Sequence, residues 1–288
     1  MDPAVGRPDW LKVRLADWES YKQTEEVVEA HGLNSVCFSA HCPNISECWG
    51  KGTATLMLLG NVCTRRCGFC AVLSGVPKAY DPHEPERVAA AVEQMGLKFA
   101  VLTSVARDDL PDGGSYVFAE SIRAIRRRTP GVGVEVLIPD FLGNQENLDR
   151  VLDAEPDVLN HNIETVERLQ RKVRPSARYD RSMRLLQRAA ERGLTAKSGL
   201  MLGLGETIRE VEQTLRDLKD HGVSVVTIGQ YLRPDEDHLP MERYVTPEEF
   251  EALGQYARDL GFVHVESAPL VRSSYHAEEA PVARPSAR

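Results

Sequence analysis

Short apolar runs alternate with longer amphipathic segments along most of the chain, beginning at Thr53. Short apolar runs predict buried strands, and segments in which apolar residues recur every three or four positions predict helices. The predicted strands cover residues 53–60, 99–105, 133–140, 157–164, 195–204, 223–231 and 262–267. The predicted helices cover residues 85–96, 113–128, 144–154, 179–193, 207–222 and 246–261. The pattern therefore indicates an α/β protein.

The number of strand–helix units indicates how the sheet closes. Strands separated by single helices pair in parallel through right-handed crossovers. Six or seven units favour a partial (β/α)6 barrel of the TIM type, although the pattern alone leaves a doubly wound sheet open. We predict an N-terminal extension at residues 1–52, the barrel at residues 53–266 and a C-terminal tail at residues 267–288.

Composition and charge narrow the class of protein. Hydrophobic residues make up 42% and charged residues 27%, which are ordinary globular values. The net charge of −8 argues against nucleic-acid binding through the whole surface. The chain has no apolar run long enough for a membrane span, and its first residues lack the apolar segment of a secretory signal. We therefore expect a cytoplasmic protein that binds neither nucleic acid nor membrane.

One segment departs from the overall acidic character. Residues 165–192 contain nine lysines and arginines against three acidic residues. A solvated helix face is the more common explanation for such a segment. The alternative is a docking surface for an acidic partner or a carboxylate ligand.

All six cysteines lie between residues 37 and 70, and three of them follow the first predicted strand as Cys63-x3-Cys67-x2-Cys70. Disulfides suit exported domains, so metal or cluster ligation explains the cysteines better. A structural zinc and a ferredoxin cluster each require four protein ligands, whereas this loop offers three. The missing ligand points to an open coordination position, at the end of a barrel strand where barrel enzymes place their chemistry.

The upstream triplet is Cys37-x4-Cys42-x5-Cys48. It follows a segment that reads as one or two helices ending at Gly32, and its loop is expected to be irregular. His41 is adjacent to Cys42 and would compete with it sterically as a fourth ligand. A donor from far along the chain is therefore expected for this triplet.

The downstream triplet, with the aromatic Phe69 before its last cysteine, matches the signature of the radical S-adenosylmethionine superfamily. Together with the upstream triplet it closely resembles the lipoyl synthase family. The resemblance extends over roughly residues 30 to 277 and includes CPNISECW, DDLPDGGS, LNHNIETV, RLQRKVRP, KSGLMLGLGET, QYLRP and the terminal RSSYHA.

The resemblance implies two [4Fe–4S] clusters and S-adenosylmethionine as cofactors. The first cluster would be held by Cys63, Cys67 and Cys70, with the amino and carboxylate groups of S-adenosylmethionine on its open iron. An auxiliary cluster would be held by Cys37, Cys42 and Cys48, with Ser274 preferred over Ser273 as its fourth ligand. The residues implied to be catalytic are Cys63, Cys67, Cys70 and Ser274.

The reaction implied by the resemblance is the insertion of two sulfur atoms at C6 and C8 of an octanoyl chain, with the auxiliary cluster as sulfur donor. The octanoyl chain would be linked to a lysine of a lipoyl-carrier domain or of the glycine cleavage H protein. Electrons would come from a reductant such as ferredoxin or flavodoxin. Carriers of this kind are generally acidic, which makes residues 165–192 a candidate docking surface.

Cofactor contacts are expected at the ends of the predicted strands. The predicted contacts of S-adenosylmethionine are Phe69, Thr103, Ser104, Asn162, Glu164 and Arg174. Glu164 would hold the ribose hydroxyls, and Arg174 would pair with the methionyl carboxylate through two hydrogen bonds. Helix caps or surface ion pairs are the alternative roles for these residues. The segment 112–114, DGG, either cradles the amino group or forms a turn.

Three other interpretations stay open from the residues. The chain could be another sulfur-inserting radical enzyme, of the biotin synthase or methylthiolating kind, which the upstream triplet and the terminal RSSYHA disfavour. It could be a zinc-stabilised binding module, which metal analysis would detect. It could also be a simple electron carrier, but such a protein needs neither the large α/β scaffold nor an open iron.

Overall fold

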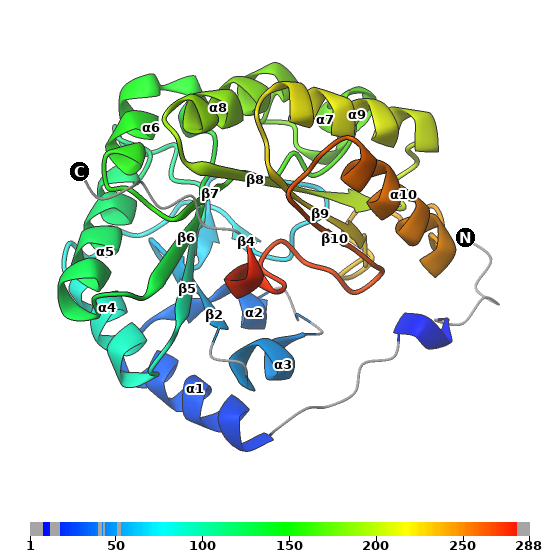
Figure 1. Cartoon of the computed structure of the whole chain (residues 1–288). Coiled ribbons are helices and arrows are strands. Elements are labelled where there is room, and N and C mark those ends of the chain that lie inside the picture. The colour runs from blue at the N-terminus through cyan, green and yellow to red at the C-terminus, as the bar shows by residue number, and fades with distance from the viewer. Residues whose placement is uncertain (1–7, 12–17, 40–41, 43, 51–52, 281–288) are drawn as a thin grey trace.

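Seven parallel strands follow one another in chain order around a curved sheet (Figure 1). The computed structural model describes residues 8–11, 18–39, 42, 44–50 and 53–280. The parallel strands are β2 (Thr53–Leu58), β5 (Phe99–Ser104), β6 (Gly133–Leu137), β7 (Val158–Asn160), β8 (Thr195–Leu202), β9 (Val225–Gln230) and β10 (His264–Ser267). The short strand β1 (Asn34–Ser35) pairs antiparallel with β2 at one edge. No pairing joins β1 to β10 among the described residues, so the barrel is open.

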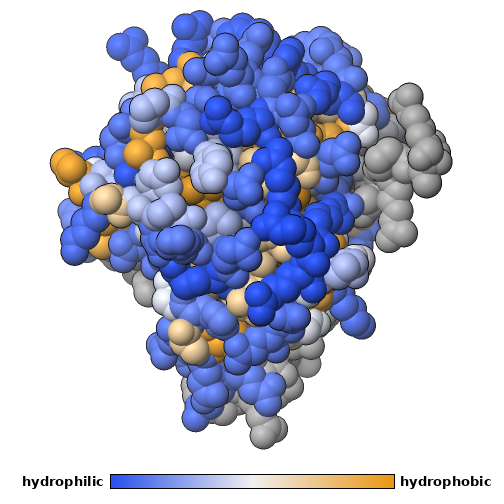
Figure 2. All heavy atoms as spheres, turned by 90° about the vertical axis from the view of Figure 1, so that its left-hand side faces the viewer, coloured by the Kyte–Doolittle hydropathy of each residue, from blue (hydrophilic) through white to orange (hydrophobic). Residues whose placement is uncertain are grey.

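Six helices connect the parallel strands and cover the outside of the sheet (Figure 1). They are α4 (Glu84–Gln94), α5 (Ser115–Arg128), α6 (Gln145–Leu152), α8 (Tyr179–Glu191), α9 (Ile208–Asp220) and α10 (Pro247–Asp259). Figure 2 shows that the face over α4, α5 and α6 is mostly hydrophilic, with apolar residues in small spots. The predicted partial (β/α)6 barrel is therefore confirmed, with a seventh parallel strand after the sixth helix.

Capping residues explain where two of these helices begin. The side chain of Thr207 accepts the amide of Glu210, and the Glu210 carboxylate accepts the amide of Thr207. The same reciprocal pair, formed by Thr246 and Glu249, begins α10. Each pair satisfies two backbone amides that have no partner within the helix.

The inside of the barrel contains a buried ion pair. Lys197 Nζ lies 2.9 Å from Glu135 Oε2, and both side chains are buried. The Asn160 amide donates to the other oxygen of Glu135 at 2.7 Å. Because a buried charge is tolerated only when it is paired and hydrogen-bonded, these three residues favour one alignment of β6, β7 and β8.

The N-terminal part forms several helical elements, some of which pack against β2. The 3-10 turn η1 (Asp9–Leu11) is followed along the chain by α1 (Trp18–Ala30), α2 (Val36–Ser39) and α3 (Ile45–Gly50). Gly32 follows α1 with a φ of +58°, in agreement with the predicted helix end. The cysteine loop is less irregular than expected, because its described residues form α2 and α3. His41 lies outside the described residues.

The segment after β10 packs back onto the barrel. The Asn44 amide donates to the carbonyl oxygen of Leu270 at 2.7 Å, and the Thr53 hydroxyl donates to Glu278 Oε2 at 2.9 Å. In the 3-10 turn η4 (Ala277–Glu279), Ala277 is buried in an apolar cluster that includes Phe99. Figure 1 shows η4, in red, near the middle of the view, in front of the ring of strands. The described part of the predicted tail is therefore integrated into the fold.

The remaining elements are short and lie in the loops. They are β3 (Val62–Cys63), β4 (Leu73–Ser74), η2 (Phe141–Gly143), η3 (Glu167–Leu169) and α7 (Gln170–Val173). Within the described part of the chain, no helix combines the length and the apolar character that a membrane crossing requires.

Candidate active site

A cavity of about 840 Å³ lies at the carboxyl ends of the strands. Both cysteine triplets and the two serines of the terminal motif contribute to its wall. The residues concerned are Cys37, Cys42, Cys48, Cys63, Cys67, Cys70, Ser273 and Ser274. Segments separated by more than 200 positions in the sequence therefore meet in one cavity.

The downstream cysteine loop is held at both ends and in the middle. Strands β3 and β4 pair in parallel where the loop begins and ends. In the middle, the Gly68 amide donates to the Val173 carbonyl at 2.9 Å, and the Leu239 amide donates to the Gly68 carbonyl at 2.8 Å. A Cβ at Gly68 would lie 2.7 Å from the Leu239 side chain, so glycine permits this close approach.

The thiols of this loop are partly buried, and one of them accepts backbone hydrogen bonds. Backbone amides of Arg65 and Ala106 donate to the Cys63 sulfur at 3.4 and 3.3 Å. Burial raises the pKa of Cys67 to about 12 and that of Cys70 to about 11. In the metal-free chain at neutral pH these two thiols are protonated, so ligation has to displace their protons.

The spacing of the thiols distinguishes a single ion from a cluster. Thiolates on one tetrahedral zinc ion lie about 3.8 Å apart, given zinc–sulfur bonds of about 2.3 Å. Among the described residues, the sulfurs of Cys63, Cys67 and Cys70 are not all within 4.8 Å of one another. In this arrangement the three sulfurs are spaced more widely than the ligands of one zinc ion, which suits thiolates that bind different irons of a cluster.

The upstream triplet is arranged by α2 and α3. The Cys42 amide donates to the Cys37 carbonyl at 3.0 Å, and the Cys48 amide donates to the Asn44 carbonyl at 3.0 Å. Burial raises the pKa of Cys42 to about 11 and that of Cys48 to about 12, and the neighbouring thiols raise both further. All three thiols contribute to the wall of the cavity.

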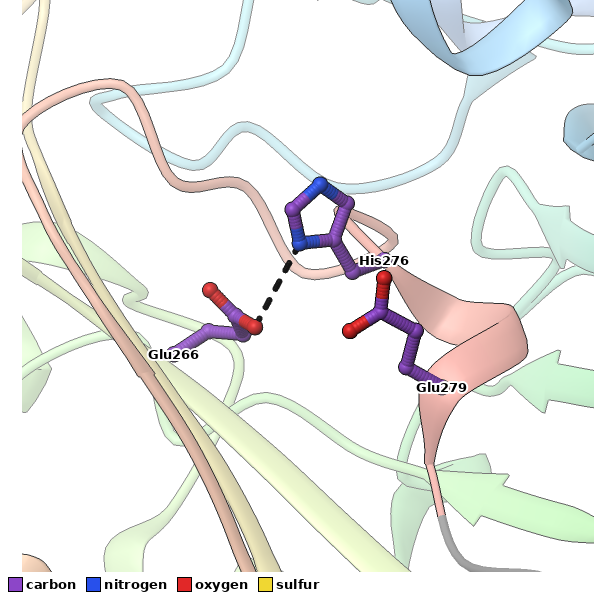
Figure 3. Close-up of side chains that lie close together, drawn as sticks. All are labelled: Glu266, His276 and Glu279. Carbon is purple, nitrogen blue, oxygen red and sulfur yellow. Dashed lines mark ion pairs between the residues drawn. The ribbon is translucent and has the colours of Figure 1, made fainter. Parts of the chain in front are cut away.

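The turn that carries the two serines is joined to the upstream triplet through His276. The Nε2 atom of His276 lies 3.5 Å from Glu47, the neighbour of Cys48, and its Nδ1 atom lies 3.4 Å from Glu266 on β10. Figure 3 shows Glu266, His276 and Glu279 pointing toward one another. Through His276, the serine turn contacts both the helix of the upstream triplet and the edge of the barrel.

All six predicted cofactor contacts lie on the cavity wall: Phe69, Thr103, Ser104, Asn162, Glu164 and Arg174. The Thr103 hydroxyl donates to the Leu137 carbonyl at 3.0 Å. The hydroxyl of Ser104 and the amide oxygen of Asn162 are buried and have no hydrogen-bond partner within the described structure. Buried polar atoms of this kind normally have partners, so these two fit contacts to a polar ligand.

Glu164 and Arg174 are set in place by the backbone around the end of β7. Glu164 has a φ of +64°, and Asn162 donates to its carboxylate at 3.1 Å. Burial raises the pKa of Glu164, while Arg174 and the Asn162 amide oppose that shift. Arg174 donates through Nη1 to the carbonyls of Asn162 and Ile163 at 2.7 and 3.0 Å, which fixes the direction of its guanidinium group.

The segment 112–114 forms a turn and lies outside the residues that line the cavity. The Asp112 carboxylate accepts the amides of Gly114 and Tyr116 at 3.1 and 2.9 Å, at the beginning of α5. Of the two roles considered from the sequence, the structure therefore favours the turn.

Arg65 and His161 are among the residues of the cavity wall that were not predicted. Arg65 pairs with Asp108 at 2.7 Å and with Asp140 at 2.7 Å, which holds the residue between Cys63 and Cys67. His161 is fully buried, and burial lowers its pKa to about 4, so it stays neutral. The position of Arg65 inside the cysteine motif could have identified it, whereas nothing in the sequence around His161 indicates its surroundings.

Known proteins resemble this chain over nearly its whole length. A family model described as the radical SAM superfamily matches residues 57–218. The lipoyl synthase of Rubrobacter xylanophilus is 58% identical over 276 residues, which cover 95% of this chain and 86% of that protein. The chain belongs to the lipoyl synthase family. The mitochondrial lipoyl synthase of Nematostella vectensis is 51% identical over 278 residues, which cover 96% of both proteins.

Solved structures support the fold of this lipoyl synthase family member. The structure of SuiB from Streptococcus suis bound to its precursor peptide SuiA superposes with a TM-score of 0.59. The superposition covers 85% of this chain and 52% of SuiB, at 10% sequence identity. At this identity the likeness shows the fold alone.

Membership confirms the predicted enzyme class and cofactors. The chain is a sulfur-inserting radical enzyme that uses S-adenosylmethionine and two [4Fe–4S] clusters. The cavity suits these groups, because six thiols contribute to its wall together with the unpartnered atoms of Ser104 and Asn162. The positions of the side chains on the cavity wall limit which of them can hold each cluster and S-adenosylmethionine.

Proposed function

We propose that this protein inserts two sulfur atoms, at C6 and C8, into an octanoyl chain carried on a lysine of a partner protein. The observation that carries the proposal is that both cysteine triplets contribute to the wall of one cavity of about 840 Å³. A radical source and a sulfur source on walls of the same cavity can act on one substrate chain without releasing it. Two separate cavities would not support this reaction.

The first cluster is assigned to Cys63, Cys67 and Cys70, with its fourth iron left for the cofactor. When bound, the cluster and S-adenosylmethionine supply one-electron chemistry that can remove hydrogen from an unactivated carbon, which no side chain can do. The chain's own residues bind and orient the cofactor. Arg174 presents a fixed guanidinium group to a carboxylate, and Glu164 accepts hydrogen bonds from ribose hydroxyls.

The rest of the cofactor contacts follow from the same geometry. The unpartnered oxygens of Ser104 and Asn162 accept donors of the bound cofactor. Thr103 retains its acceptor capacity, because its hydrogen is already donated to Leu137. The apolar ring of Phe69 contributes to the same wall and limits the entry of water.

The auxiliary cluster is assigned to Cys37, Cys42 and Cys48, with Ser274 as its fourth ligand. A serine oxygen binds cluster iron less well than a thiolate does, so this corner of the cluster is the easiest to open. A cluster that opens at one corner suits a role as the sulfur donor.

The position of Gly229 gives a prediction about the serine turn. A Cβ at Gly229 would lie 2.2 Å from the Val271 carbonyl oxygen, so Gly229→Ala has to push the terminal segment away from β9. We expect the auxiliary cluster to be lost, with iron falling from about eight to about four per chain. Cleavage of S-adenosylmethionine should stay within about threefold of that of the unchanged protein, since the downstream loop is not touched.

The matched control for this prediction is Gly75→Ala, whose Cβ would make only an ordinary contact of 3.4 Å with Val62. Iron content and S-adenosylmethionine cleavage are measured on both variants after anaerobic purification. If Gly229→Ala keeps all its iron, Gly229 has no part in placing the serine turn.

The identities of the carrier protein and of the electron donor go beyond what family membership establishes. The octanoyl chain is carried by a lipoyl-carrier domain or by the glycine cleavage H protein, and a ferredoxin or flavodoxin supplies electrons. A lysine arm with its octanoyl chain is long enough to enter a cavity at the mouth of the barrel while its carrier stays outside. A cytoplasmic location remains a prediction from the sequence.

The test is anaerobic incubation of the protein with an octanoyl-lysyl peptide, S-adenosylmethionine and dithionite, followed by mass measurement. The expected product carries two additional sulfur atoms, and a hexanoyl-lysyl peptide, which has no C8, gains at most one. Transfer of a methylthio group, or consumption of S-adenosylmethionine with no sulfur gained by the octanoyl peptide, would contradict the proposal.

A further inference from the structure

A second cavity, of about 260 Å³, lies between the start of α6 and one side of α8. Its wall includes four arginines of the basic segment, Arg178, Arg181, Arg184 and Arg188, and one carboxylate, Asp140. We refer to these five residues as the arginine cleft. Since α6 and α8 both begin at the carboxyl ends of the strands, the cleft lies on the same side of the barrel as the active-site cavity.

The carboxylates around the cleft are outnumbered by guanidinium groups. Asp180 lies 3.0 Å from Arg178 and 2.9 Å from Arg184, and Asp140 lies 2.9 Å from Arg181. Asp180 is therefore shared by two arginines whose side chains are each 65% exposed. Guanidinium groups keep free donors when one carboxylate serves two of them, so this cleft can accept anionic side chains. The local charge of the cleft is therefore positive, although the net charge of the whole protein is −8.

The loop beside the cleft has an unfavourable backbone conformation. Phe141, Leu142 and Gly143 follow one another with φ values of 44°, 54° and 83°. Left-handed conformations are costly for residues with a Cβ, and they persist where the surroundings enforce them and a function uses them. Here Phe141 is buried, and the Asp140 carboxylate accepts the amide of Leu142 at 3.2 Å.

This backbone directs an apolar side chain outward at the edge of the cleft. Leu142 is 53% exposed and contributes to the wall of the cleft beside the arginines. Leu142 thus offers an apolar contact beside cationic groups, and protein interfaces combine contacts of both kinds. The cleft and Leu142 therefore suit a partner that combines acidic and apolar side chains.

The cleft is also linked directly to the downstream cysteine loop. The two oxygens of Asp140 are divided between the two sites, one pairing with Arg181 in the cleft and the other with Arg65 at 2.7 Å. Arg65 stands between Cys63 and Cys67. A protein bound at the cleft therefore lies beside the active-site cavity, at a place from which a flexible lysine arm can enter it.

We propose that the arginine cleft with Leu142 is the docking surface for the acidic carrier protein that bears the octanoyl-lysine. The proposal rests on the proposed function, since it assigns a place to that carrier. Carboxylates of the carrier enter the cleft and bind Arg178 and Arg184, while an apolar carrier side chain covers Leu142. The docking surface determines which carrier is used and how fast it associates, and the chemistry inside the cavity is independent of it.

The experiment compares two substrates, an octanoylated lipoyl-carrier domain and an octanoyl-lysyl peptide too short to reach the cleft. In the double variant Arg178→Glu/Arg184→Glu at low salt, we expect KM for the carrier domain to rise at least about tenfold. Turnover of the peptide should stay within about twofold, which also shows that the variant is folded. The variant Leu142→Asp should raise KM for the carrier domain at both low and high salt.

The matched control is Arg127→Glu/Arg128→Glu. These arginines are also exposed and ion-paired, but they lie in the last turn of α5, at the opposite end of the barrel. The control should process both substrates as the unchanged protein does. If the Arg178/Arg184 variant binds the carrier domain normally, or if both double variants lose affinity equally, the docking proposal is overturned. Failure of the unchanged protein to add sulfur to either substrate would instead overturn the proposed function.

Discussion

The variant Cys67→Ala is expected to lose about four of about eight irons and to cleave S-adenosylmethionine at least about 1,000-fold more slowly. Three thiolates are the minimum for a cluster that keeps one iron open, and two cannot replace them. Cys67 is only partly exposed and lies near Cys63, Cys70 and Arg174. Removal of its sulfur leaves the loop with two thiolates, one fewer than the cluster requires.

The matched control for this prediction is Cys42→Ala in the upstream triplet. It should also lose about four irons, yet its cleavage of S-adenosylmethionine should stay within about threefold of the unchanged protein. Both variants should fail to add sulfur to the octanoyl-lysyl peptide. Iron analysis and quantification of the cleavage products separate the two cases. Normal cleavage by Cys67→Ala would show that the downstream loop does not hold the radical-generating cluster.

The second large effect is expected for Ser274→Ala. Loss of the oxygen ligand opens the auxiliary cluster permanently, so sulfur addition to the octanoyl-lysyl peptide should fall at least about 100-fold. Cleavage of S-adenosylmethionine should persist, because the downstream triplet is unchanged. The expected result is an enzyme that consumes its cofactor without forming the thiolated product, measured by mass spectrometry of peptide and nucleoside in one reaction.

The neighbouring variant Ser273→Ala is the control, since both serines line the cavity and differ only in their place on the turn. Sulfur addition by Ser273→Ala should stay within about threefold of the unchanged protein. If Ser273→Ala is the inactive variant and Ser274→Ala is active, the ligand assignment has to be exchanged between the two serines.

The barrel could be predicted because each strand is a short apolar run and each outer helix has an apolar face. The predicted strand that differs most from the structure is the one at residues 157–164, of which only Val158–Asn160 form a strand. At Glu164 the backbone adopts a positive φ and makes an isolated bridge to Leu200. This departure from strand geometry turns Asn162 and Glu164 toward the cavity, and apolar periodicity does not report it.

Other features depend on contacts between distant segments. The C-terminal segment has no periodicity, and its position follows from single contacts such as those of Asn44 with Leu270 and of His276 with Glu47. The basic segment 165–192 could be recognised, but its ion pairs with Asp140 and Asp149 could not. These pairs reduce the free charge of the segment and concentrate its available donors in the arginine cleft.

The central claim is that the two triplets hold two clusters rather than zinc ions or disulfides. It is tested most directly by metal analysis and thiol titration of protein purified without oxygen. We expect about eight irons per chain, negligible zinc and no disulfide among the six cysteines. One zinc per chain bound by Cys63, Cys67 and Cys70, or a disulfide between any two of them, would contradict the claim.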